Sequence, residues 1–205
     1  MGFWRDQVVP RVVDRALAGP DVQEMRRRVC AGLQGDVVEV GFGSGLNVPH
    51  YPDPVTRVYA VDPSHVGARL ARKRLTQSAV PVERAGLDGQ RLDLPTESID
   101  CALSTFSLCA IPDPSAALAE LRRVLRTDGA FHFLEHGRAP DPRVARAQDL
   151  IQPVHGRLAA GCHITRDIAG LIGAAGFALE DLRTYYAKGP RPFTYVYEGI
   201  ARKPA

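Results

Sequence analysis

The sequence of 205 residues lacks the features that mark membrane-spanning, secreted or nucleic-acid-binding proteins. No stretch approaches the roughly 20 apolar residues that cross a bilayer, and the charged N-terminal stretch MGFWRDQVVPRVVDRAL lacks the apolar centre of a signal peptide. The 26 Lys and Arg residues nearly balance 23 Asp and Glu residues. The net charge of +3 is too small to indicate a nucleic-acid-binding face, and the basic run Arg26–Arg28 is interpreted as a solvated helix face. We therefore expect a cytoplasmic protein with no nucleic-acid partner.

Cysteine is also sparse, with four residues in the chain. Cys30, Cys101, Cys109 and Cys162 form neither a CxxC pair nor a zinc-type spacing. They are expected to be free thiols in a reducing compartment.

The remaining composition, 45% hydrophobic, is sufficient for one core. Apolar residues recur at helical spacing over residues 3–18, with Pro10 early in the helix or kinking it. We predict an N-terminal helical lid over residues 1–30 and a main domain over residues 31–205. Residues 1–20 are expected either to pack on that domain or to make peripheral contact with a membrane surface.

Beyond residue 35, strands and helices alternate, which predicts an α/β fold with a doubly wound, mostly parallel sheet. The expected strands are Val37–Val40, Val58–Val61, Val80–Arg84, Ile99–Leu103 and Ala130–Leu134. Expected helices are residues 64–77, capped by Ser64, and Ser115–Leu125, stopped by Asp128-Gly129.

The C-terminal part follows a different pattern. A helix over Thr165–Ala175, closed by Gly176, precedes two β-rich segments, Ala178–Tyr186 and Phe193–Ala201, which should pair as an antiparallel hairpin. The segment 138–163 is neither strand nor cleanly periodic helix. Following the fifth strand, it should cover the carboxyl edge of the sheet.

The stretch VVEVGFGSGLNVPHYP carries the main functional signal. Gly41, Gly43 and Gly45 directly follow a strand, which suggests a loop whose backbone a ligand approaches closely. Asp62 ends the next strand 21 residues after Gly41, where a carboxylate can accept hydrogen bonds from ribose hydroxyls. The alternative is that Asp62 only begins a turn with Pro63.

The dinucleotide pattern GxGxxG requires glycine where Leu46 stands. The shorter GxGxG resembles class I S-adenosylmethionine-dependent methyltransferases, as do LDGQRLDLPTESID and LRRVLRTDGAFHFLEH. VVEVGFGSGLNVPHYP, STFSLCAIPDP, FLEH and GCHITRD resemble most closely the methyltransferase-like seven group of thiol methyltransferases and its bacterial relatives. This resemblance implies a seven-stranded Rossmann-like sheet with an antiparallel C-terminal hairpin, and S-adenosyl-L-methionine as the cofactor.

The resemblance also assigns cofactor contacts to residues at the strand ends. The methionine portion is assigned to Glu39, Gly41, Gly43 and Gly45; the ribose to Asp62; the adenine to Pro63, Ser64, Gly89 and Gln90; and the sulfonium to Ser104, Thr105 and Phe106, just beyond the fourth strand.

Methyl transfer from a sulfonium needs neither a metal nor a covalent enzyme intermediate, so neither is expected. Much of the catalysis can come from positioning, and a histidine can remove the acceptor's proton. Candidate catalytic residues are His136 and Glu135 after the fifth strand, and His163 in the covering segment. The alternative for Glu135 and His136 is a hydrogen-bond network that anchors a turn. Cys162 is interpreted as a small apolar wall residue.

The leading hypothesis is a methyltransferase acting on a small apolar acceptor, with a thiol preferred. Methylation of a quinol or phenol, or of a lipid headgroup, is the alternative within the enzyme class. A nicotinamide oxidoreductase and a cofactor-binding protein without turnover are the other classes considered.

Overall fold

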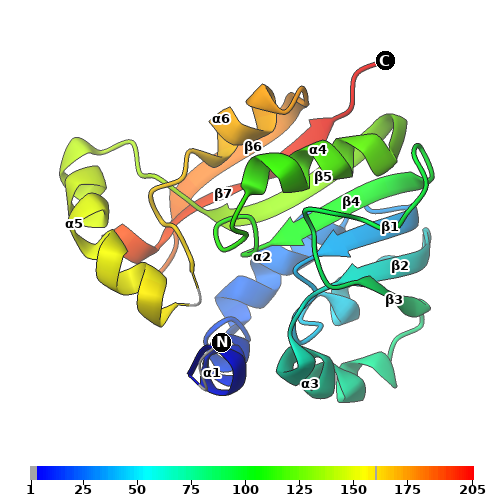
Figure 1. Cartoon of the computed structure of the whole chain (residues 1–205), viewed down its shortest axis with the longest axis horizontal. Helices are drawn as coiled ribbons and strands as arrows, with labels where there is room; N and C mark the ends of the chain where they lie inside the picture. The colour runs from blue at the N-terminus through cyan, green and yellow to red at the C-terminus, as the bar shows by residue number, and fades with distance from the viewer. Residues whose placement is uncertain (1–3, 160) are drawn as a thin grey trace.

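A seven-stranded sheet forms the centre of the computed structural model, which describes residues 4–159 and 161–205 (Figure 1). The strand order is β3-β2-β1-β4-β5-β7-β6. The strands are β1 Gly35–Val40, β2 Val55–Val61, β3 Val82–Gly86, β4 Ile99–Thr105, β5 Leu125–His136, β6 Ala178–Tyr186 and β7 Tyr195–Arg202. β1 to β5 pair in parallel, whereas β7 is antiparallel to both β5 and β6. The predicted fold class and C-terminal hairpin are confirmed.

Helices cover both faces of this sheet (Figure 1). They are α1 Val9–Ala16, α2 Pro20–Cys30, α3 His65–Leu75, α4 Pro114–Val124, α5 Pro142–Leu158 and α6 Ile168–Ala174, with short η1 Trp4–Val8, η2 Val48–His50 and η3 Arg191–Phe193. Adjacent residues of one strand point to opposite faces. Val38 accordingly packs in the core that holds α4 and α6, and Val37 in the core that holds α2. Both valines are fully buried, as expected for a parallel strand covered on two sides.

The N-terminal segment contains more than one helix. The predicted helix over residues 3–18 is divided into the π-helical turn η1 and α1, with Pro10 in the first turn of α1; residue 3 lies outside the described residues. α2 packs directly on the sheet through Met25, Val29 and Cys30. The division at residue 30 stays a prediction, although α2 packs against β5 and β7 of the sheet.

Two predicted element starts were wrong. The helix predicted over Ser115–Leu125 spans Pro114–Val124 as expected to within one residue, but the fifth strand, predicted to begin at Ala130, already begins at Leu125. Asp128 has a φ of +62°, and its N–H donates to the Lys203 carbonyl, so the Asp-Gly pair forms an irregularity inside a strand. The helix predicted from Thr165 begins at Ile168, because Asp167 caps it by accepting from the Gly170 N–H.

No helix was predicted for residues 138–163, which were described as neither strand nor cleanly periodic helix. This segment contains the 17-residue helix α5, with Pro153 inside it. Few of its residues are buried, and Leu150, Val154 and Leu158 are exposed at 82%, 59% and 57%. Pro153, a residue that disfavours helix interiors, argued against a helix at the sequence level. α5 lies beyond the carboxyl ends of the central strands (Figure 1). That residues 138–163 cover this edge stays a prediction.

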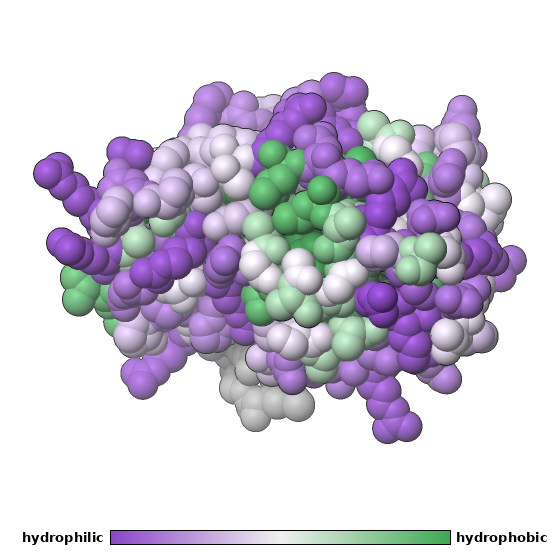
Figure 2. Space-filling model, turned by 90° about the horizontal axis from the view of Figure 1, so that it is seen from above, coloured by the Kyte–Doolittle hydropathy of each residue, from purple (hydrophilic) through white to green (hydrophobic). Residues whose placement is uncertain are grey.

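None of the helices within residues 4–159 and 161–205 is both long and apolar enough to cross a membrane. The surface is mixed: in the view from above, apolar residues gather near the middle of the face and hydrophilic residues surround them (Figure 2).

Candidate active site

The loop after β1 is shaped by its three glycines. Gly41, Gly43 and Gly45 have φ of +79°, +53° and +72°, a region that side chains disfavour. A Cβ on Gly41 would lie 1.8 Å from Ser107 Oγ, so this position admits glycine alone. A Cβ on Gly43 would meet no atom closer than 3.8 Å, and its backbone therefore borders open space. The loop offers exposed main chain to a ligand, as the motif predicts.

Asp62 lies beside this loop at the end of β2. One of its carboxylate oxygens accepts from the Gly43 N–H at 2.8 Å and the other from the Ser64 N–H at 2.7 Å. Burial raises the pKa of Asp62, and these two N–H groups partly offset that rise. Each oxygen keeps a lone pair free for a further donor. Asp62 therefore both fixes the glycine loop and can accept from a ligand hydroxyl.

A buried polar network supports the loop from behind. Arg26 of α2, 3% exposed, donates to Asn47 Oδ1 at 2.7 Å and to Thr105 Oγ1 at 2.8 Å. Asn47 in turn donates to Glu39, which also accepts from the Tyr51 hydroxyl. Burial raises the pKa of Glu39 to about 7, against the opposing effect of these hydrogen bonds. The network therefore connects the glycine loop, through Asn47, to Glu39 of β1, to Thr105 of β4 and to Arg26 of α2.

Arg26, Asn47 and Tyr51 were not predicted as site residues. The interpretation of Arg26–Arg28 as a solvated helix face was wrong for Arg26, whose guanidinium also lies 5.5 Å from the centre of the Phe106 ring. One of its atoms, Nε, is buried with no hydrogen-bond partner among the described residues. A basic run gives no signal for which member turns inward, because that depends on how α2 packs.

The residues assigned to the adenine lie at the same edge of the sheet. Ser64 caps α3 by accepting from the Gly67 N–H at 3.0 Å, which confirms the predicted cap, and Pro63 is exposed. Gly89 packs so closely on Val40 that a Cβ would lie 2.5 Å from its Cγ1. The Gln90 side chain accepts from the Asp113 N–H at 2.9 Å, which ties this loop to the start of α4.

The loop after β4 begins later than predicted. Ser104 and Thr105 belong to β4 and are buried, so only Phe106 lies beyond the strand. Phe106 has a φ of +53°, and its ring lies 4.7 Å from that of His136, centre to centre. Phe106 is therefore the one residue, of the three assigned to the sulfonium, that lies beyond the end of β4.

Glu135 holds this loop in place. It is fully buried and accepts from the Ser104 hydroxyl at 2.7 Å and from the backbone N–H groups of Ser107 and Cys109. Burial raises the pKa of Glu135, and these donors oppose that rise. These contacts favour an anchoring role over direct contact with an acceptor; a catalytic role stays a prediction.

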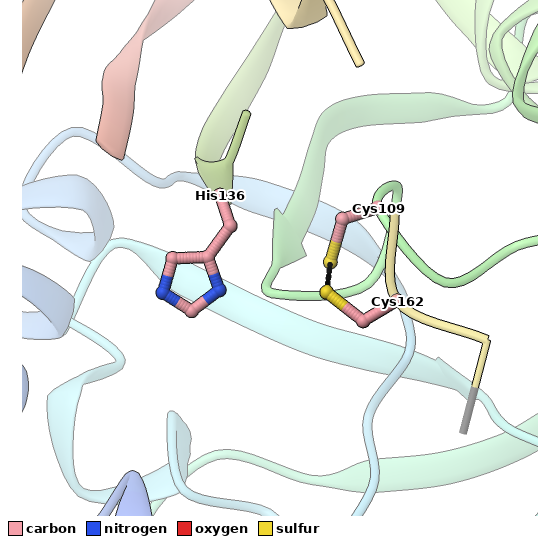
Figure 3. A group of neighbouring side chains, drawn as sticks. All are labelled: Cys109, His136 and Cys162. Atoms are coloured by element: carbon pink, nitrogen blue, oxygen red, sulfur yellow. Dashed lines mark hydrogen bonds between the residues drawn. The ribbon is translucent and has the colours of Figure 1, made fainter. Parts of the chain in front are cut away.

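His136 ends β5 and faces two cysteines (Figure 3). Cys109 Sγ and Cys162 Sγ lie 3.3 Å apart. The hydrogen bonds with Cys109 and His136 lower the pKa of Cys162, whereas the bond with Cys162 and burial raise that of Cys109. Cys162 is therefore part of a polar cluster, which corrects its interpretation as an apolar wall residue. Phe106, Cys109, His136 and Cys162 are called the acceptor side below, and residues 41–47 with Asp62 the cofactor side.

His163 is next to this cluster in sequence but serves another surface. Its N–H donates to the Cys109 carbonyl at 2.7 Å, which joins the covering segment to the loop after β4. Its ring lies 3.3 Å from Gln152 Nε2 and lines a hollow of about 390 Å³ along α5. A catalytic role for His163 stays a prediction.

Comparison with known proteins agrees with this geometry. Residues 38–133 match the methyltransferase domain family. The chain is 30% identical over 179 residues to the thiol S-methyltransferase TMT1A of Homo sapiens, covering 82% of this chain and 72% of that protein. It is 34% identical over 116 residues to a phosphatidylethanolamine N-methyltransferase of Cereibacter sphaeroides, covering 54% of this chain and 57% of that protein.

Solved structures show the same fold. A methyltransferase from Thermotoga maritima, described as S-adenosylmethionine-dependent, superimposes with a TM-score of 0.67 at 22% identity, covering 97% of this chain and 99% of that one. The glycine loop, the acidic strand end and the extent of the match to TMT1A lead to one assignment. The chain belongs to the S-adenosylmethionine-dependent methyltransferases, in the family that includes the thiol S-methyltransferases.

Proposed function

We propose that this protein transfers a methyl group from S-adenosylmethionine to the sulfur of a small apolar thiol. The observation that carries the proposal is the match to TMT1A across 82% of the chain. The acceptor side adds independent support, because it combines an aromatic wall, Phe106, with an imidazole at the carboxyl ends of β4 and β5. In parallel α/β sheets this edge is where ligands bind.

The cofactor side fits S-adenosylmethionine. Gly43 presents a backbone with open space in front of it, and Asp62 has acceptor capacity for ribose hydroxyls. Arg26, with a buried Nε lacking a partner among the described residues, carries a positive charge that suits the carboxylate of the methionine portion. The cofactor supplies a methyl group made electrophilic by the attached positive sulfur.

The protein must then orient the acceptor and favour its deprotonated form. Holding the acceptor sulfur about 3–3.5 Å from the methyl carbon is worth up to roughly 7–11 kcal/mol. A free thiol with a pKa near 8.5 is only about 3% ionised at pH 7. His136, held against Phe106, is the group we assign to accept the thiol proton.

The test is incubation of the purified chain with isotopically labelled S-adenosylmethionine and a panel of alkyl and aryl thiols, with matched alcohols and phenols as controls. Labelled thioethers should form, and the alcohols should remain unmodified. Absence of thioether across the panel, with S-adenosylhomocysteine still bound in calorimetry, would contradict the proposal for the acceptor but not for the cofactor.

A second candidate is methylation of a lipid headgroup amine. It is favoured by the match to the phosphatidylethanolamine N-methyltransferase. The exposed residues Val12, Val13 and Trp4 also lie in the N-terminal segment, and Trp4 Nε1 donates to the Leu158 carbonyl of α5. This apolar surface supports the proposal that residues 1–20 contact a membrane.

Vesicles separate the two candidates. Flotation with vesicles containing phosphatidylethanolamine should recover the chain, and Val12→Asp with Val13→Asp should abolish flotation. If methylated lipid forms and the thiols remain unmodified, the second candidate replaces the first.

A further inference from the structure

Three side chains from distant parts of the chain converge at the acceptor side (Figure 3). Cys109 follows β4, His136 ends β5, and Cys162 follows α5. One potential ligand atom from each residue lies within 4.8 Å of the corresponding atoms of the other two. The sequence does not reveal this group, because 27 residues separate the first two members and 26 the last two.

Backbone contacts hold the three residues in place without using their side chains; His136 is held by the pairing of β5 with β7, opposite Val196. The Cys109 N–H donates to Glu135, and its carbonyl accepts from the His163 N–H. Gln152 of α5 donates to the Cys162 carbonyl at 3.1 Å and accepts from the Ile164 N–H at 2.9 Å. The two sulfurs and the imidazole are therefore arranged by the fold before any ligand arrives.

The donor set is selective. Thiolates and imidazole bind zinc and other thiophilic ions, whereas calcium and magnesium require oxygen ligands. In a tetrahedral zinc site with Zn–S bonds of about 2.3 Å, two sulfurs lie about 3.8 Å apart. The observed 3.3 Å therefore needs an opening of about 0.5 Å. A disulfide of about 2.05 Å would instead require the sulfurs to close by more than about 1 Å, and it would leave His136 unused.

Burial differs among the three residues. Cys109 is 1% exposed, whereas His136 and Cys162 are only half-buried. His155 lies beside Cys162 but outside the mutually close group. A zinc site that keeps one coordination position open for substrate has this arrangement, with three protein ligands and one accessible side.

We propose that Cys109, His136 and Cys162 bind Zn²⁺ and leave its fourth coordination position to the acceptor thiol. The part concerning the thiol rests on the proposed function, whereas the metal site does not. The acceptor S–H loses its proton to solvent as its sulfur binds the ion. In the transfer, a C–S bond forms to that sulfur as the sulfonium C–S bond breaks, and the electron pair of that bond stays with the donor's sulfur. His136 is then a zinc ligand, and the ion takes over the thiol activation assigned above to the free imidazole.

The first experiment measures metal binding without activity. The full chain carrying Cys30→Ala and Cys101→Ala, and therefore only two cysteines, is reduced and dialysed against Zn²⁺. We expect one zinc per chain, and an affinity at least about 100-fold weaker in Cys162→Ser and in His136→Ala, because each removes a ligand. His163→Ala is the matched control and should bind as before. Zinc binding that is absent, or unchanged in Cys162→Ser, overturns the site. So does a Cys109–Cys162 disulfide that forms once the reductant is removed, in a chain that takes up no zinc.

The second experiment tests the open position with Co²⁺ as a spectroscopic probe. Sulfur-to-cobalt charge-transfer absorption should appear in the chain with two cysteines and increase when an alkyl thiol is added. No increase, with the metal still bound, overturns the open position alone. Full thiol methylation by a chain freed of metal overturns the role of zinc but leaves the proposed function intact. Bound metal without thiol methylation leaves the metal site intact but overturns the proposed function and the role of zinc in it.

Discussion

The cofactor side and the acceptor side are built in different ways. Residues 41–47 are one continuous loop, and Asp62 fixes it through the Gly43 N–H. The acceptor side instead draws single residues from three segments that β4, β5 and α5 bring together. A site made from one loop leaves a pattern in the sequence, whereas a site made from scattered residues does not.

Arg26 connects the two sides. It donates to Asn47 in the cofactor loop and to Thr105 at the end of β4, and it lies over the Phe106 ring. The two sides therefore share one buried cation. The following four predictions test how independent they are, in order of decreasing expected effect.

Replacing Arg26 should have the largest effect because it removes the shared element. Arg26→Met should lower the free energy of unfolding by about 3–5 kcal/mol, since it leaves the buried acceptors of Asn47 and Thr105 without their shared donor and removes a positive charge that attracts Glu39. Urea denaturation measures this change. Arg27→Met is the control, because Arg27 is exposed and pairs with Glu24 on the same helix. The stability of this variant should equal that of the wild type. An equal loss of stability in both variants would show that the burial of Arg26 does not set it apart from the other arginines of the run Arg26–Arg28.

Stability should also depend on pH through Glu39. Its pKa is raised from 4.5 to about 7 by burial, so the folded state holds the proton more tightly than the unfolded state. The contribution of Glu39 to the free energy of unfolding is therefore fully present below pH 4.5. It decreases by about 3 kcal/mol as the pH rises to about 7. Burial lowers the pKa of His132, which acts in the opposite direction. The measured quantity is consequently the difference between wild type and Glu39→Gln across this range, and a flat difference would contradict the buried carboxyl.

On the cofactor side alone, Asp62→Ala should weaken binding of S-adenosylhomocysteine by about 100-fold. The variant loses charge-assisted bonds to ligand hydroxyls and the bonds that fix Gly43 and Ser64. Isothermal calorimetry gives the affinity. The affinity of Asp62→Asn, which retains one acceptor oxygen, should lie between those of the wild type and Asp62→Ala. At saturating cofactor, the KM for the acceptor should stay unchanged; a large change would mean that the two sides are coupled through this residue.

The complementary change on the acceptor side is His136→Ala. Turnover should decrease by about 50-fold, since the variant loses both the proton acceptor and the ligand of the proposed zinc, while a thiol is already partly ionised without help. Affinity for S-adenosylhomocysteine should stay within about twofold. Single-turnover kinetics and calorimetry separate these quantities. Matching losses in both would show that the imidazole mainly supports Phe106 and the cofactor pocket.

The accuracy of sequence-based prediction follows the same division. The glycine loop, the Ser64 cap and the C-terminal hairpin depend on nearby residues, and each was predicted with the right type and place. α5 was missed because Pro153, which disfavours a helix interior, lies inside it. Arg26 was misjudged because nothing local distinguishes it from Arg27.

The sequence by itself determined the α/β order of elements, the cofactor loop and the acid at the end of β2, because these depend on backbone conformation and on spacing along a few residues. Tertiary structure alone decided that Arg26 turns inward and that Cys109, His136 and Cys162 meet. Such contacts arise where strand ends and a covering helix are packed together, and no short-range pattern records which distant side chains will face each other there.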